Sequence, residues 1–394
     1  MFYQRNSNHS PGEINLNAEE IVFIDTEIDI HGEKILDIGA VKGNGQEFHA
    51  RVQHGSLREF CGFLRGNTYI CAHNILNHDL KYLDNQITEY NVLEIVQNKN
   101  AQRKSAHRLQ DIYSVIDTLY LSPLLFPQKP YHHLVKDDKL AADELNNPLN
   151  DAKKARDLFH DEAAKFAELE EPLAEIYCAL LSGRDEFKGF FQYIGCKKAQ
   201  RNISGLILET FKDKICAHAP VGKLAEKHPT ELCFALSQIH VIQYDSITPP
   251  WVLKNYPRVE NVLHLLRSRK CASCAYCAES LDETRALSRF FHFDGFRRYN
   301  GKPLQKNAIQ AAVANKSLLA IFPTGGGKSI AFQLPALMAG VNEKGLTVVI
   351  SPLQSLMKDQ TDNLEKQHNI TEAVTINSSL DPLEKYVQKA GRAA

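Results

Sequence analysis

The first part of the chain alternates short apolar runs with polar segments, a pattern typical of buried strands. Residues 21–24 (IVFI) form one continuous apolar run, and residues 35–41 form a second. Runs of this length indicate strands with both faces covered, and the turn near His31 allows the two to pair antiparallel. Similar alternation continues to about residue 150, so we expect an α/β sheet.

The pattern changes to a helical one from Asp151. Apolar side chains then recur three or four positions apart, at Ala155, Leu158, Phe159, Ala163, Phe166 and Leu169, as expected for a helix with one buried face. Residues 171–285 are predicted to be mostly helical. A second α/β pattern starts near Phe290 and predicts a helix over 304–314, a strand over 318–322, a helix, and a strand over 346–350.

These changes divide the chain into four segments. We predict a polar tail at 1–17, an α/β domain at 18–170, a helical connector at 171–285 and a second α/β region at 286–394. A chain of 394 residues is long enough for two or three separate cores.

Composition narrows the class of protein. The formal net charge is −1, so binding to nucleic acid must depend on local basic patches. No apolar run reaches the length of a membrane span, and the polar N-terminus lacks a secretion signal. The nine cysteines favour reduced thiols in the cytoplasm over a disulfide framework.

A pair of carboxylates closes the first apolar run. Because side chains alternate along a strand, Asp25 and Glu27 point to the same face. Two like charges on one face favour a cation between them, and hard oxygen ligands suit Mg²⁺ or Mn²⁺. The alternative is a solvated strand end, which is common for a single Asp and less so for this pair.

Further acidic residues follow in order along the same segment. Asp79 and Asp151 each lie near a predicted helix start, and Asp117 precedes Thr118. Over about residues 18–170 this order resembles the DnaQ-like (DEDD) 3′–5′ exonucleases, which have an RNase H-like fold. The resemblance implies 3′–5′ exonuclease activity with two metal ions, and single-stranded DNA or DNA 3′ ends as the partner. The implied ligands are Asp25, Glu27, Asp79 and Asp151.

The sequence departs from this family at the general base. The family has His five residues before the last Asp, or Tyr four before it, and Asn146 and Asn147 occupy those positions. An amide cannot take a proton from water. His132 or His133 is a candidate substitute, although a surface loop explains that pair equally well. If the base is missing, the domain is a DNA-binding module that does not cut.

Three cysteines lie close together in the predicted connector. Cys271, Cys274 and Cys277 form C-x₂-C-x₂-C, which favours a Zn²⁺ or iron–sulfur site over free thiols on a polar loop. Both kinds of site usually take four ligands. The candidates for the fourth are Cys196, Cys216, Cys233 and His264, or a residue beyond the C-terminus.

A glycine-rich loop follows the predicted strand at 318–322. Residues 323–329 (PTGGGKS) precede a predicted helix, and Phe322 replaces the glycine of the strict phosphate-loop pattern. Backbone N–H groups of such a loop bind phosphate oxygens. We therefore expect nucleotide contacts from Thr324, Gly325, Gly326, Gly327 and Lys328, with Ser329 holding Mg²⁺; a chance glycine turn is the alternative.

Segments around this loop identify the type of nucleotide site. Residues 290–297, 304–305, 332–335 and 351–360 closely resemble the opening of RecQ-type superfamily 2 DNA helicases. The resemblance covers about residues 286–370 and implies a RecA-like lobe that binds ATP with Mg²⁺. It assigns recognition of adenine to Gln305 and contact with the base to Arg297.

The acidic D-E-x-H motif and the second lobe of that family would follow residue 394. We therefore expect the N-terminal portion of a longer protein, with an incomplete RecA-like lobe. This segment would bind nucleotide but neither hydrolyse ATP nor unwind a duplex.

Overall fold

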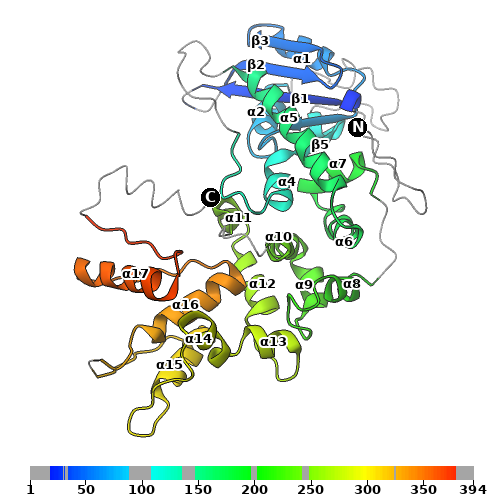
Figure 1. Ribbon diagram of the computed structural model, residues 1–394. Helices are drawn as coiled ribbons and strands as arrows, with labels where there is room; N and C mark the ends of the chain where they lie inside the picture. Colours follow the sequence, from blue (N-terminus) through cyan, green and yellow to red (C-terminus); the bar gives the residue numbers. More distant parts are fainter. Residues whose placement is uncertain are drawn as a thin grey trace, which may run out of the picture. The chain divides into compact units, whose positions relative to one another are not determined.

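The computed structural model describes residues 18–29, 31, 34–87, 108–134, 147–196, 202–241, 248–323 and 325–378. The chain forms two compact units (Figure 1). The first comprises residues up to 125 and 132–201, and the second comprises 126–131 and the residues from 202 onward.

The first unit contains a five-stranded mixed sheet with the order β3-β2-β1-β4-β5. The strands are β1 (Ile21–Ile28), β2 (Ile35–Lys42), β3 (Glu47–Arg51), β4 (Tyr69–Ala72) and β5 (Ser114–Asp117). β2 pairs antiparallel with β1 and β3, whereas β4 pairs parallel with β1 and β5. The predicted α/β sheet and its first antiparallel pair are therefore confirmed.

Helices cover both faces of this sheet. They are α1 (Ser56–Phe63), α2 (Asp79–Ile87), α4 (Thr118–Leu125), α5 (Pro148–Ala167), α6 (Glu171–Leu181) and α7 (Asp185–Tyr193), with short 3-10 turns η1 (Ala18–Glu20) and η2 (Leu109–Asp111). Val22 and Ile24 join the apolar core that includes residues of α1 and α2, whereas the Phe23 ring lies 5.6 Å from that of Phe159 in α5. Alternate side chains of β1 thus enter two different cores.

Helix α5 crosses β1 and β2 at very short range (Figure 1). A Cβ atom on Gly39 would lie 2.1 Å from the backbone nitrogen of Leu149. Any side chain at position 39 would therefore push the start of α5 away from the sheet. This close approach places the first turn of α5 beside the middle of β1, because Gly39 pairs with Asp25.

Helices α6 and α7 also belong to the first unit, which therefore continues past residue 170. Cys178 in α6 and Cys196 beyond α7 form a disulfide with a Cα–Cα distance of 5.9 Å, within the range that a disulfide can bridge. The expectation that all nine cysteines are reduced is wrong for this pair. Packing between α6 and α7 brings Cys178 and Cys196 together, and the spacing of residues in the sequence does not predict that packing.

Apart from an isolated bridge between Tyr299 and Lys302, the regular secondary structure described in the second unit is helical. Its helices are α8 (Ile203–Thr210), α9 (Val221–Lys227), α10 (Pro229–His240), α11 (Pro250–Asn255), α12 (Arg258–Arg267), α13 (Ala275–Ser280), α14 (Glu283–Phe291), α15 (Leu304–Val313), α16 (Ile330–Glu343) and α17 (Gln354–His368). The mostly helical character predicted for residues 171–285 is confirmed. Residues of α14 to α17 share one apolar core, which includes Leu287, Ile309, Leu334 and Leu364.

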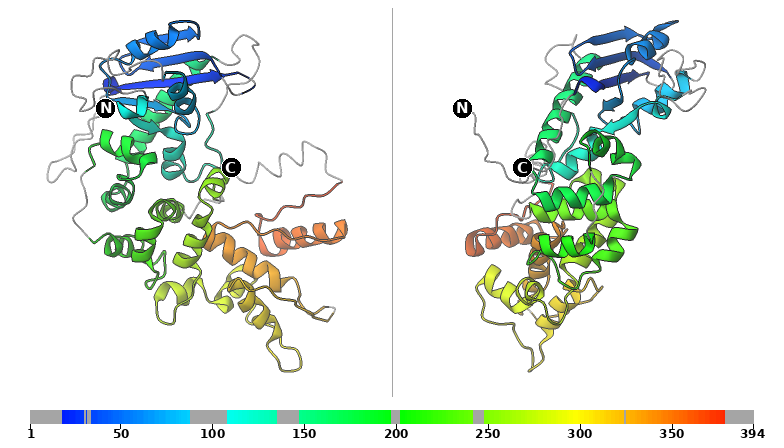
Figure 2. Two further views of the ribbon diagram at one scale, coloured as in Figure 1. Left: turned by 180° about the vertical axis from the view of Figure 1, so that it is seen from behind. Right: turned by 90° about the vertical axis from the view of Figure 1, so that its right-hand side faces the viewer.

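Two predicted strands are absent from the second unit. Residues 318–322 and 346–350 run as irregular backbone (Figure 2), and Leu319 and Ile350 are 87% and 92% exposed. A strand requires hydrogen bonds to a neighbouring strand. Among the described residues, neither segment has such a neighbour, so the expected sheet of a RecA-like lobe is missing there. The helix predicted over 304–314 is confirmed as α15.

No helix among the described residues combines the length and apolar character needed to cross a membrane.

Candidate functional sites

Three of the four predicted carboxylate ligands meet on one face of β1. Oxygen atoms of Asp25, Glu27 and Asp151 lie within 4.8 Å of one another. Asp25 and Glu27 are half-buried on the face of β1 that α5 covers, and Asp151 lies in the first turn of α5. The close approach of α5 at Gly39 therefore assembles this group.

Asp79 reaches the same strand from the other face of the sheet. It is the first residue of α2, as predicted, and is almost fully buried. Its Oδ1 accepts a hydrogen bond of 2.8 Å from the Thr26 hydroxyl, and its buried Oδ2 has no hydrogen-bond partner among the described residues. Thr26 lies between Asp25 and Glu27 but points to the opposite face, which explains why Asp79 is adjacent to the carboxylate group without belonging to it.

The loop that leads to Asp79 is held by Asp117, at the end of β5. Its carboxylate accepts hydrogen bonds from the backbone N–H groups of Asn74, Leu76 and Leu119 at 2.9 to 3.1 Å. Burial raises the pKa of Asp117 to about 7. The acidic residue noted before Thr118 thus positions the segment before α2.

Neither asparagine position supplies a base. Asn146 lies outside the described residues. The Asn147 side chain accepts a 3.0 Å hydrogen bond from the Leu149 N–H and caps α5, with Pro148 at the first helical position. Asn147 therefore has a structural role that explains its place in the sequence.

The two candidate histidines, His132 and His133, differ in burial and contacts. Nδ1 of His132, which is buried, lies 2.8 Å from the Ser122 hydroxyl, and His133 is exposed. Neither belongs to the group of ligand atoms around Asp25.

Sequence reasoning did not single out His78, which directly precedes Asp79. Its Nδ1 lies 3.8 Å from Asp79 Oδ1, and its side chain is 43% exposed. The neighbouring Asp79 carboxylate raises the pKa of His78, and the charge of Glu27 contributes to the increase. The only signal in the sequence was its position beside an acidic residue.

A further histidine lies beside the end of β5. The His73 Nδ1 is 3.0 Å from the Thr118 hydroxyl. Burial, with a smaller effect of His133, lowers the pKa of His73 to about 4. This imidazole is therefore neutral near pH 7.

In the second unit, Gln305 links the glycine loop to the residues before α15. Gln305 is buried, its Oε1 accepts a 2.8 Å hydrogen bond from the Arg297 N–H, and its Nε2 donates a 2.9 Å hydrogen bond to the Gly327 carbonyl. The Arg297 guanidinium donates to the Gly325 carbonyl, and the Tyr299 hydroxyl donates to that of Gly326. The structure thus brings the predicted Arg297 and Gln305 to the loop.

The loop conformation depends on its glycines. Gly325 and Gly327 have φ values of 75° and 70°, which favour glycine. A Cβ on Gly327 would also lie 2.8 Å from Gln305 Nε2. Lys328 is exposed, Ser329 directly precedes α16, and Thr324 lies outside the described residues.

Two glutamines connect this loop to α17. Gln360 donates a 3.1 Å hydrogen bond to the Ser329 hydroxyl and accepts one of 2.6 Å from Gln333. All three residues line a cavity of about 550 Å³ together with Arg297 and Gln305. Both glutamines fall inside the segments that resembled RecQ-type helicases, but the sequence did not assign them a role.

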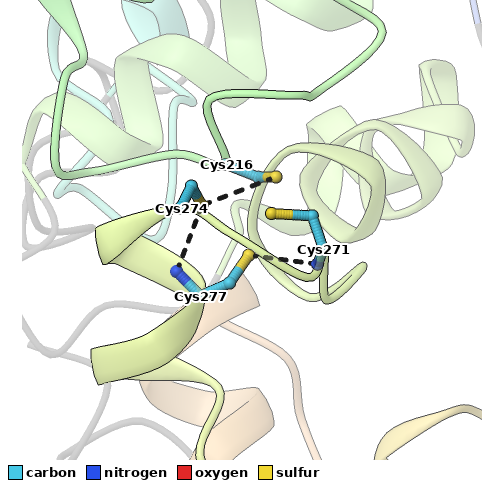
Figure 3. A group of neighbouring side chains, drawn as sticks. All are labelled: Cys216, Cys271, Cys274 and Cys277. Carbon is cyan, nitrogen blue, oxygen red and sulfur yellow. Dashed lines mark hydrogen bonds between the residues drawn. The ribbon is translucent and has the colours of Figure 1, made fainter.

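The cysteine cluster gains a fourth member from a distant segment (Figure 3). The sulfur atoms of Cys216, Cys271, Cys274 and Cys277 lie within 4.8 Å of one another. The other candidates for a fourth ligand do not belong to this group. Cys196 is in a disulfide, and Cys233 lies in α10 outside the group. His264 contacts Glu343 instead, with 2.8 Å between Nδ1 and Oε1.

The glycine loop lies in the part of the chain that is similar to a known protein family. The DEAD/DEAH box helicase family matches residues 302–391. The match is consistent with a RecA-like lobe, although the described residues lack its sheet.

Three of the relatives found are named as ATP-dependent DNA helicases. The chain is 44% identical over 90 residues to the ATP-dependent DNA helicase RecQ of Synechocystis sp., covering 23% of this chain and 16% of the relative. It is 43% identical over 108 residues to RecQ of Bacillus subtilis, covering 27% and 17%. It is 46% identical over 80 residues to the ATP-dependent DNA helicase hus2/rqh1 of Schizosaccharomyces pombe, covering 20% and 6%. The chain therefore contains a portion related to RecQ-type helicases and spans a small part of each relative's length.

No solved structure gives a significant match to this chain.

Proposed function

We propose that this chain belongs to a nucleic-acid processing protein in which a metal-dependent 3′–5′ exonuclease unit precedes a RecQ-type ATP-dependent DNA helicase portion. The observation that carries the exonuclease part is the convergence of Asp25, Glu27 and Asp151. Three like charges this close repel one another. Lys154, whose Nζ lies 3.6 Å from Asp151 Oδ1, reduces that repulsion, and a divalent cation held by all three carboxylates would reduce it further.

The donor set fits Mg²⁺ or Mn²⁺. Three carboxylates offer hard oxygen ligands, whereas Asp79, on the opposite face of β1, lies outside their group. Metal ions bound there would activate a water molecule and stabilise the leaving oxygen of a phosphodiester. β1 and α5 hold Asp25, Glu27 and Asp151 on one face, while the Thr26 hydroxyl orients Asp79 from the other.

For the helicase portion, we propose that ATP occupies the cavity lined by Arg297, Gln305, Gly327 and Ser329. Lys328 is exposed at the loop and would reach the phosphates, while Ser329 would hold Mg²⁺. Gln305 and Arg297 would contact the base. The linked action of the intact protein would combine ATP-driven strand separation with trimming of DNA 3′ ends.

A nuclease assay tests the first half of this proposal. A 5′-labelled single-stranded oligonucleotide is incubated with the chain and Mg²⁺ or Mn²⁺, and the products are resolved by length. We expect stepwise shortening from the 3′ end that EDTA and Asp25→Ala both abolish. Asp157→Ala is the matched control, because Asp157 lies in α5 with a side chain that is 68% exposed.

A second function has one specific observation in its favour. Asn147 stands at a usual base position and is engaged in capping α5, so the unit would grip DNA ends without cutting them. Binding of the oligonucleotide with unchanged length, under both metals, would support this alternative and refute the exonuclease.

A further inference from the structure

The four sulfur atoms of the cysteine cluster come from two segments of the second unit. Cys216 follows α8, whereas Cys271 and Cys274 directly precede α13 and Cys277 lies in its first turn (Figure 3). The Cys216 and Cys274 sulfurs are 3.9 Å apart, and all four lie within 4.8 Å. Cys216, Cys274 and Cys277 are buried in a small cluster with Tyr276 and Leu281.

Backbone N–H groups point at three of these sulfurs. His218 donates to Cys216, Cys277 donates to Cys274, and Cys271 donates to Cys277, each at 3.4 Å. Donors aimed at sulfur favour the thiolate form, which is the form that binds metal. These N–H donors therefore favour binding of a cation by the four sulfur atoms.

Hydrogen bonds outside the sulfur atoms hold the two segments together. The Cys216 N–H donates to the Leu266 carbonyl at 2.8 Å, and buried Arg267 donates to the Lys214 carbonyl at 2.7 Å. The Tyr276 hydroxyl donates to the Arg267 carbonyl at 2.8 Å. The end of α12 thus fixes the loop carrying Cys216 and the helix carrying Cys277.

We propose that Cys216, Cys271, Cys274 and Cys277 bind one Zn²⁺ ion as a structural site. Four thiolates at about 2.3 Å from a tetrahedral ion have sulfur atoms about 3.8 Å apart, close to the 3.9 Å between Cys216 and Cys274. An iron–sulfur cluster places several metal and sulfide ions between its ligands, which requires more widely spaced thiolates. Four protein ligands leave no open position, so the ion serves the fold rather than a reaction.

The site lies where the connector meets the helicase-related portion. α13 leads directly into α14, whose Leu287 and Phe291 belong to the core shared with α15 to α17. Lys270 and Glu283 form an ion pair of 3.7 Å across the same junction. A bound ion would fix the start of α14 to the loop after α8, so the proposal does not depend on the exonuclease or on ATP binding.

The test measures metal content in the full chain, purified under reducing conditions without a metal-binding tag. We expect one zinc per chain, and after exchange with Co²⁺ the absorption of a tetrahedral cobalt–thiolate site. Cys216→Ser is expected to weaken zinc binding by more than about 100-fold, since loss of an outer-shell partner alone costs 10–100-fold. Cys233→Ala is the matched control, because Cys233 is a buried free thiol outside the group.

Several results would overturn the proposal. Iron with inorganic sulfide, less than half an equivalent of any metal after reconstitution, or full zinc affinity in Cys216→Ser would each do so. If Cys216→Ser does not fold, the cobalt spectrum of the unaltered chain decides, since its intensity reports the number of thiolate ligands. Cys271→His supplies a second variant, which should retain zinc because imidazole is also a zinc ligand.

Discussion

Substitution of Gly39 by alanine tests whether the approach of α5 assembles the carboxylate group. An added Cβ would lie 2.1 Å from Leu149 N and 2.2 Å from the Pro148 carbonyl carbon, whereas ordinary contact begins at 3.4 Å. Both are backbone atoms of the first turn of α5, so no side-chain rotation relieves the clash. The start of the helix must retreat by about 1.3 Å, the difference between 2.1 Å and 3.4 Å.

This displacement has two expected consequences. Overpacking of a close contact lowers the free energy of unfolding by about 1–3 kcal/mol. Asp151 moves with the first turn of α5, and a shift of about 1 Å in a catalytic group costs about 100-fold in rate. We therefore expect Gly39→Ala to weaken Mn²⁺ binding. We also expect it to reduce any 3′–5′ nuclease rate by more than the lower free energy of unfolding accounts for.

The assays are urea denaturation followed by circular dichroism, hydrogen–deuterium exchange of β2 and α5, and Mn²⁺ titration. Gly62→Ala is the control: a Cβ there meets nothing within 4 Å, and the change lies inside α1, where alanine is favoured by about 0.5–1 kcal/mol. Unchanged stability and Mn²⁺ affinity in Gly39→Ala would refute the argument that α5 holds Asp151 against β1.

Three further predictions concern other parts of the chain. Gln305→Ala removes the hydrogen bonds to the Arg297 N–H and to the Gly327 carbonyl of the glycine loop. It should weaken binding of a fluorescent ATP analogue about 5- to 150-fold, since a lost buried hydrogen bond costs about 1–3 kcal/mol; Gln310→Ala, exposed on the same helix, should leave that binding unchanged. His73 has a folded pKa of about 4 against an ordinary 6.5, so its contribution to stability is present above pH 6.5 and is lost as pH falls toward 4. Urea denaturation of His73→Gln across that range should show a flatter pH dependence than the unaltered chain, whereas exposed His54→Gln should match the unaltered chain. Chelation of zinc should lower the melting temperature and speed hydrogen exchange around Cys216 and Cys277; unchanged exchange there would count against a structural ion.

Local sequence patterns predicted several features of the first unit correctly. The apolar runs predicted β1 and β2 correctly because each strand is covered on both faces, so burial shows directly in the order of side chains. Alternation along β1 also predicted that Asp25 and Glu27 share a face, which agrees with the carboxylate group. The position of Asp79 at the start of α2 was also predicted from the sequence, since acidic residues favour helix starts.

Local sequence patterns did not predict which distant segments contact one another. Residues 318–322 and 346–350 have the composition of strands, but strand formation depends on a hydrogen-bonded neighbour, and no described residue provides one. The disulfide between Cys178 and Cys196 depends on how two helices turn against each other. Both corrections concern contacts that no local spacing encodes.

The sequence by itself determined which chemical groups this protein carries: a pair of carboxylates on one strand, a glycine loop before a helix, and three clustered thiols. Tertiary structure alone decided how these groups are completed. It brought Asp151 to Asp25, set Asp79 on the opposite face through Thr26, and selected Cys216 as the fourth thiol. The reason is physical: side-chain type and local periodicity are properties of a short segment, whereas a site needs atoms a few ångströms apart, and only the packing of helices and sheet sets those distances.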